Sequence, residues 1–247
     1  MTSGTGLGFE EIRAANKDIW RGRSGKAQKS ESHNRGRWRA RFCISSLSNS
    51  CKGVGRIRVV DHDVVELSNL NRQILHWEKD IGREKAESFE EKLSQMNPDL
   101  EVSVMSVMTQ RISEDNVADV IKGSDLMVDA VDNFQARYLL NRVALEKNMP
   151  FFHGGVYGFE GQVTTIIPGE TACLRCIFPE APAPETFPVI GATCGVIGCI
   201  QATEVVKYIV GVGELLTNRL LVWDGLNARM EEFEVERNPA CEDCCSQ

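Results

Sequence analysis

Two pairs of closely spaced cysteines carry the sharpest chemical signal in the sequence. Cys173-Leu-Arg-Cys176 and Cys241-Glu-Asp-Cys244 are separated by 64 residues. A CxxC turn lets two sulfurs reach one ion, and Zn²⁺ prefers tetrahedral thiolate coordination. Two such pairs complete a four-cysteine site, so we expect Zn²⁺ bound by Cys173, Cys176, Cys241 and Cys244. Because four thiolates leave no coordination position open, this zinc is expected to stabilise the fold and not to catalyse a reaction.

Two other interpretations of these cysteines stay open. The pairs can be two unrelated exposed turns, or one of them can be a redox dithiol. A redox CxxC opens a helix after a strand, and neither pair is predicted to do so. Cys245 is a neighbouring thiol without an assigned role.

A second group of polar residues lies in the run VVDHDVVELSNLNRQ, residues 59–73. Asp61 ends a predicted strand, which is where doubly wound folds hold ribose hydroxyls. Asn69, Asn71 and Arg72 supply hydrogen-bond donors in the short loop that follows, and Arg suits bidentate contact with phosphate. The run therefore indicates a nucleotide site.

Two charged residues further along the chain extend this nucleotide site. Lys85 stands near the start of the next predicted helix, where a cation can meet phosphates. Asp132 follows another strand end and can hold Mg²⁺, which favours carboxylate and phosphate oxygens. Each residue alone is more typical of a turn or a solvated charge, and it is their combination that indicates nucleotide chemistry.

Hydrophobic periodicity predicts the elements that position these residues. We expect strands at 56–60, 101–107, 126–131, 150–156 and 162–167, and helices at 84–96, 115–121 and 135–148. This alternation predicts an α/β fold with a doubly wound, mainly parallel, Rossmann-like sheet. A helix at 196–210 and an antiparallel strand pair at 219–223 and 231–235 are expected to complete the C-terminal part.

Composition limits the class of protein. The chain has 247 residues, of which 42% are hydrophobic and 26% charged, as in globular domains. No apolar run is expected to approach the roughly 20 residues of a membrane helix. The N-terminus lacks a secretory h-region, which makes the cytoplasm the default location. Nine cysteines in a cytoplasmic chain indicate metal binding or catalysis more than disulfides.

Several motifs in series resemble one family. VVDHDVVELSNLNRQ, GREKAES, DAVDN, EGQVT, CLRC, GVIGCIQATEVVK and NPACEDC occur in the order found in the ThiF/MoeB/HesA family. The resemblance covers residues 53–247, which we therefore expect to form an adenylation domain. It implies an ATP-dependent adenylyltransferase that activates the C-terminal Gly-Gly of ubiquitin-like sulfur carrier proteins, such as those of thiamin and molybdopterin synthesis.

The resemblance also implies roles for individual residues. Asp61 would bind ribose, Lys85 would contact phosphates, and Asp132 with Asn133 would serve Mg²⁺ and the nucleotide. The residues lining the nucleotide and its phosphates would be Ser68, Asn69, Leu70, Asn71 and Arg72. The carrier carboxylate would attack the α-phosphate of ATP, giving an acyl-adenylate and pyrophosphate, with catalysis by positioning and charge neutralisation from Arg72, Lys85 and Asp132. The four cysteines match the zinc ligands of the family, whose members are commonly homodimers.

The sequence departs from the family in the loop after the first CxxC. Many relatives carry a transfer cysteine there, and residues 179–192 contain none. Cys194 lies just beyond, at the predicted helix start, where a helix N-terminus can lower the pKa of a thiol. A small, half-buried thiol without a catalytic role is the more ordinary interpretation of Cys194.

The second departure is residues 1–52, which lack the RYxRQ motif and Gly-rich phosphate loop of the family. They carry eleven Lys and Arg against four Asp and Glu, and their composition predicts disorder. Shifted forward by one nucleotide in one permissible set of codons, EIRAANKDIW encodes RYGRQTRIYG and SESHNRGRWRARF encodes QNHIIAGGGGLGS. We hypothesise that this segment is an out-of-frame translation and not a nucleic-acid-binding arm. Stop codons in the shifted frame of the gene would exclude the idea.

Other functions remain as alternatives to the adenylyltransferase. The chain can be an inactive, zinc-stabilised relic that still binds a carrier. An NAD-dependent dehydrogenase is disfavoured because the sequence has no GxGxxG. A family member that acts on tRNA is disfavoured by the acidic body, since the residues after 52 carry a net charge of −14.

Overall fold

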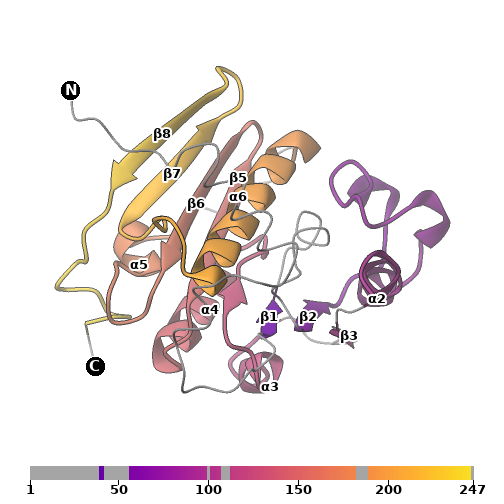
Figure 1. Ribbon diagram of the computed structural model, residues 1–247, viewed down its shortest axis with the longest axis horizontal. Helices are drawn as coiled ribbons and strands as arrows, with labels where there is room; N and C mark the ends of the chain where they lie inside the picture. The colour runs from indigo at the N-terminus through magenta and orange to yellow at the C-terminus, as the bar shows by residue number, and fades with distance from the viewer. Residues whose placement is uncertain (1–38, 42–55, 99–100, 107–111, 182–188, 246–247) are drawn as a thin grey trace.

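The computed structural model of the protein describes residues 39–41, 56–98, 101–106, 112–181 and 189–245 (Figure 1). Its first sheet has three parallel strands, β1 (Arg39–Arg41), β2 (Arg56–Asp61) and β3 (Glu101–Ser106), in the order β1-β2-β3. The strand β1 lies inside the segment 1–52, for which composition predicts disorder. The rest of that segment is outside the described residues.

The second sheet has five strands in sequence order. They are β4 (Met127–Val128), β5 (Phe151–Tyr157), β6 (Glu160–Ile166), β7 (Arg219–Asp224) and β8 (Arg229–Glu234). Only β4 and β5 pair in parallel, and every later pair in this sheet is antiparallel. Contacts between β1 and β4 bring the edges of the two sheets together.

The expected α/β fold with a C-terminal antiparallel part is therefore present, but the strands are mixed parallel and antiparallel and not mainly parallel. The difference begins at β5 and β6, which sequence periodicity cannot distinguish from a parallel pair. Only Gly158 and Phe159 separate these strands. A parallel connection needs a dozen or more residues, so such a short turn forces a hairpin. The antiparallel pair β7–β8 is confirmed.

Helices cover both faces, as a doubly wound fold requires. The helices α2 (Lys85–Met96) and α6 (Gly191–Val210) share one apolar core with β2, β4 and β5. The opposite core contains α3 (Val117–Ile121), α4 (Phe134–Glu146) and α5 (Leu174–Ile177). In Figure 1, α2 lies beside β2 and β3, while α6 runs along the five-stranded sheet.

Neighbouring residues of the central strands divide between these two cores. Met127 and Phe151 belong to the core under α3 and α4, whereas Val128 and Phe152 belong to the core under α2 and α6. Successive side chains of a strand point to opposite faces, so a strand buried on both faces is apolar throughout. This explains why the sequence is apolar at both neighbouring positions of each strand, at Met127 and Val128 and at Phe151 and Phe152.

The helix α6 corrects two expectations. It begins at Gly191, five residues before the predicted start, because glycines in its first turns obscure the helical pattern. With 20 residues it is also long and apolar enough to span a membrane, by length and composition alone. However, it packs on β5 and β6, and it buries the polar side chains of Gln201 and Glu204 against the sheet. That is the packing of a core helix.

Candidate functional site

The end of β2 and the start of α2 bring two of the predicted site residues together. Asp61 is the last residue of β2, and its Oδ1 accepts a hydrogen bond of 2.9 Å from the Asp63 amide. Lys85, the first residue of α2, is buried, and its Nζ lies 2.8 Å from Asp63 Oδ2. Burial raises the pKa of Asp61 above its usual value, although the Asp63 amide and Lys85 oppose this. At this corner, therefore, the ammonium group of Lys85 and the carboxylate of Asp61 are both partly shielded from water.

The loop after β2 gathers the predicted hydrogen-bond donors. It contains the 3-10 helix η2 (Leu67–Asn69). Arg72 Nη1 donates to the Ser68 carbonyl and to Asn71 Oδ1, both at 3.0 Å. The side chain of Asn69 is buried, and its Oδ1 accepts 3.0 Å from the Glu66 amide, so Asn69 shapes the loop. Leu70 is half-buried beside it.

This loop packs directly on the start of α6. Asn71 Nδ2 donates 3.0 Å to the Val189 carbonyl. A methyl group placed on the Cα of Gly191 would lie 1.9 Å from the Asn71 carbonyl oxygen, which is far inside van der Waals contact. Glycine at this position is therefore what allows the loop and the helix to touch.

Gly191→Ala is expected to destabilise the protein by about 1–3 kcal/mol and to weaken ATP binding, because the loop that holds Asn71 and Arg72 must move away. Thermal unfolding and calorimetric titration with ATP measure the two effects. Gly195→Ala in the same helix is the matched control, since its methyl group would meet nothing within 4 Å. It should leave ATP binding unchanged and stabilise the helix slightly. Equal behaviour of the two variants would contradict the contact.

Asp132 and Asn133 form a separate pair at the start of α4. Asn133 is the N-cap of the helix, and its Oδ1 accepts 2.8 Å from the Ala136 amide. Its Nδ2 donates 3.1 Å to Asp132 Oδ1, and both side chains are exposed. Among the residues that the structure describes, no hydrogen bond or ion pair joins this pair to Arg72 or Lys85. The two groups lie at the carboxyl ends of β2 and β4.

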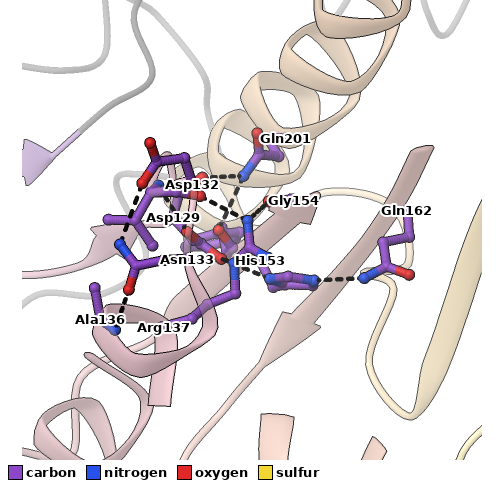
Figure 2. A network of polar contacts seen from close by, with 11 residues as sticks. Asp129, Asp132, Asn133, Ala136, Arg137, His153, Gly154, Gln162 and Gln201 are labelled. Carbon is purple, nitrogen blue, oxygen red and sulfur yellow. Dashed lines mark hydrogen bonds and ion pairs between the residues drawn. The ribbon is translucent and has the colours of Figure 1, made fainter. Parts of the chain in front are cut away.

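A buried polar network lies beside the Asp132 loop (Figure 2). The sequence motifs did not predict this network. Asp129 Oδ2 is 2.6 Å from His153 Nδ1 and 2.8 Å from Arg137 Nε. Polar residues within apolar runs, at Asp129 before the Asp132 loop and at His153 in the strand FFHGG, were the available signal. A buried charge or imidazole is rarely tolerated without partners, so such residues mark a network.

The four predicted zinc ligands lie together. Their sulfurs are all within 4.8 Å of one another, with separations of 3.8 Å for Cys173–Cys176, 3.6 Å for Cys173–Cys241 and 3.5 Å for Cys176–Cys244. Tetrahedral Zn–S bonds of about 2.3 Å imply sulfur separations of about 3.8 Å. The distances are too long for a disulfide. The donor set and its spacing therefore fit zinc.

Side chains around the cysteines connect them to α4. Asn141, which is fully buried, accepts 2.9 Å from the Leu174 amide through Oδ1. Its Nδ2 donates 2.8 Å to Asp243 Oδ2. One residue of α4 thus holds both cysteine-bearing turns.

The structure corrects one expectation about the cysteines and agrees with another. Cys173 is the N-cap of the short helix α5, so the first CxxC does open a helix after a strand. What argues against a redox dithiol is the second pair of sulfurs beside it. Cys194 lies in the first turn of α6 as predicted, but burial raises its pKa, although the charge of Arg72 acts in the opposite direction. Desolvation of the thiolate thus outweighs the lowering that a helix N-terminus can cause, and Cys194 is half-buried, as its more ordinary interpretation expects.

The comparisons with known proteins agree with this arrangement. The ThiF family profile matches residues 45–243. The chain is 46% identical over 198 residues to the SAMP-activating enzyme E1 of Haloferax volcanii, covering 78% of this chain and 72% of that protein. It is 38% identical over 203 residues to the sulfur carrier protein adenylyltransferase of Thermus thermophilus, covering 78% of this chain and 74% of that protein.

Two further matches concern length and fold. The adenylyltransferase and sulfurtransferase MOCS3 of Mus musculus is 38% identical over 202 residues, but the chain spans only 43% of that protein. The crystal structure of E. coli MccB with MccA-N7isoASN superposes with a TM-score of 0.75 at 20% identity, covering 85% of this chain and 67% of that chain. At that identity the match establishes the fold.

Proposed function

The chain belongs to the ThiF family, and on that premise we propose that it is an ATP-dependent adenylyltransferase that activates the C-terminal Gly-Gly of a ubiquitin-like sulfur carrier protein. The observation that carries the proposal is the cluster at the carboxyl end of β2. There Asp61 and Lys85 lie at one corner, and the loop bearing Ser68, Asn71 and Arg72 follows it.

Each residue has a role that suits its place. Asp61, at a strand end, accepts hydrogen bonds from the ribose hydroxyls. The cations of Arg72 and Lys85 neutralise phosphate charge that builds up as pyrophosphate leaves. Asn69 and Leu70 hold the loop in shape from its buried side. The carrier carboxylate forms a bond to the α-phosphorus, the bond to pyrophosphate breaks, and the carrier becomes an acyl-adenylate.

Asp132 and Asn133 are the residues that would hold Mg²⁺ and the nucleotide. Within the described part of the chain, the exposed carboxylate of Asp132 accepts one hydrogen bond, of 3.1 Å from Asn133 Nδ2, which fits a hard cation that prefers oxygen ligands. Bound Mg²⁺ would supply further neutralisation of phosphate charge. The four cysteines would hold Zn²⁺ as a structural ion, because a Cys₄ set has no free position.

We also propose that the protein is cytoplasmic and forms a homodimer. Unpaired cysteines and ATP chemistry suit a reducing cytoplasm. A homodimer is the assembly that the family resemblance favours.

Pyrophosphate exchange tests this function. Labelled pyrophosphate should enter ATP only when the protein is mixed with a ubiquitin-like protein that ends in Gly-Gly, taken from the same genome. The same carrier without its last glycine is the control and should give no exchange. Carrier binding without exchange would favour the inactive relic, and absence of both binding and exchange with every such carrier would refute the proposal.

A further inference from the structure

Three side chains from three elements meet in the interior beside the Asp132 loop. Asp129 follows β4, Arg137 lies on α4 and His153 lies on β5. They are 1%, 8% and 0% exposed, respectively. The carboxylate oxygen Asp129 Oδ2 contacts both His153 Nδ1 and Arg137 Nε. A charged group buried this deeply needs such partners, because its desolvation is otherwise very unfavourable.

The neighbours of His153 define which ring nitrogen carries the proton. Nδ1 faces the Asp129 carboxylate at 2.6 Å, so it donates. Nε2 lies 3.3 Å from Gln162 Nε2, an amide donor, so it accepts. Burial lowers the pKa of His153, which agrees with a neutral ring, and Arg137 helps to hold the pKa of Asp129 below its usual value despite burial. His153 is therefore oriented from both sides (Figure 2).

The same carboxylate fixes the backbone that leads to Asp132. Asp129 Oδ1 accepts 3.1 Å from the Val131 amide. Arg137 Nη2 donates 2.7 Å to the Val131 carbonyl. Both polar groups of Val131, the residue directly before Asp132, are thus bonded to this ion pair.

Gln201 on α6 bonds the backbone at Asp129 and Phe152 from the opposite side. Gln201 Nε2 donates to the carbonyls of Asp129 and Phe152, at 3.0 and 3.1 Å. Its amide fills the space over Gly154, where a Cβ would lie 2.3 Å from Gln201 Cδ. The chain is therefore held from Asp129 to Val131, and Asp132 and Asn133 project from the end of this held segment.

We propose that His153 is a positioning residue. By donating a hydrogen bond to Asp129, it fixes the carboxylate that holds Val131. In this way it places Asp132 and Asn133 toward the nucleotide. The role toward the nucleotide rests on the proposed function, whereas the effect of His153 on the loop does not. A histidine that only filled the core could be replaced by any side chain of similar volume without effect on Asp132.

Two substitutions at His153 separate these roles. In His153→Asn the amide nitrogen takes the place of Nδ1 and can still donate to Asp129, whereas His153→Leu keeps the volume and removes the donor. We expect His153→Leu to lower kcat for exchange by about 10²-fold, the scale of a 1 Å misplacement, and His153→Asn to stay within several-fold of the parent. Equal losses in the two variants would contradict the proposal.

Coupling to Asp132 gives the second test. If His153 acts through Asp132, His153→Leu should add nothing in an Asp132→Ala background, since the group that it positions is already gone. Calorimetric titration with Mg²⁺ and a non-hydrolysable ATP analogue gives the same comparison without turnover. Additive losses in both measurements would overturn the role.

A third readout requires neither nucleotide nor carrier. In ¹⁵N NMR spectra, His153 should show a protonated Nδ1 and an unprotonated Nε2, and the amides of Val131, Asp132 and Asn133 should shift in His153→Leu but not in His153→Asn. Thr165→Val is the control for loss of a buried hydrogen bond near His153, because Thr165 pairs with Phe152 on the neighbouring strand but its Oγ1 donates 2.8 Å to Glu204 and not to the Asp129 network. It should lower Tm without moving those three amides. Unshifted loop amides in His153→Leu would refute the inference even if exchange activity were never observed.

Discussion

Lys85→Met is expected to reduce carrier-dependent pyrophosphate exchange by about 10²- to 10³-fold, the range for removal of a single group that stabilises transition-state charge. Lys85 starts α2 beside Asp61, and its ammonium group is buried against Asp63. Methionine keeps most of the side-chain volume and removes only the charge. The measurement is the rate of exchange at saturating ATP and carrier.

Stability should change little in this variant. The side chain of Asp63 is 51% exposed, so water can solvate its carboxylate when Lys85 is gone. Lys79→Met is the matched control, because Lys79 lies on the 3-10 helix η3 (Glu78–Asp80) with a side chain that is 59% exposed. That control should keep full exchange. An unchanged rate in Lys85→Met, with Tm also unchanged, would remove Lys85 from the proposed site.

Cys244→Ser is expected to abolish stoichiometric zinc binding and to lower the free energy of unfolding by about 3 kcal/mol or more, since metal binding to a structural site contributes directly to folding. For a chain of this size, that corresponds to a fall in Tm of about 6–12 °C. Elemental analysis of the purified protein and thermal unfolding measure the two quantities. A strong chelator should have the same effect on the parent protein.

Cys245→Ser supplies an unusually close control. Cys245 Sγ lies 3.7 Å from Cys244 Sγ but is exposed, and it donates to the Asn238 carbonyl at 3.2 Å. This variant should retain one zinc per chain and nearly the parental Tm. If instead Cys245→Ser lost the metal and Cys244→Ser kept it, the assignment of the fourth ligand would be wrong.

Most elements of the fold were predictable from local pattern. Strands such as β2 and helices such as α2 and α4 have a periodicity that survives in the structure within a few residues of the expected bounds. The pairing of β5 with β6 was not predictable from periodicity, because a strand buried on both faces has the same pattern in either orientation. The start of α6 was hidden by glycine, whose helix propensity is low wherever it stands.

The site was predictable where a polar residue ends a strand, and it was missed where a polar residue lies within an apolar run. In DAVDN, the second aspartate was expected to bind Mg²⁺, and the first was taken as part of a strand. The structure ends β4 at Val128 and buries the carboxylate of Asp129 between Arg137 and His153. These partners are 8 and 24 residues away along the chain, so only the tertiary arrangement reveals them. Whether Asp132 binds the ion remains a prediction for the experiments above.

The helix α4 contributes residues both to the proposed Mg²⁺ site and to the surroundings of the four cysteines. Its first cap is Asn133, next to Asp132, and two turns later Asn141 holds the two cysteine-bearing turns. If loss of the metal displaced Asn141, the same helix would carry part of that displacement to Asn133 at its N-terminus. Metal affinity and nucleotide affinity would then be thermodynamically linked, and each ligand would change the affinity for the other by the same factor. A zinc ion that never touches the substrate would in this way set how well the substrate is held.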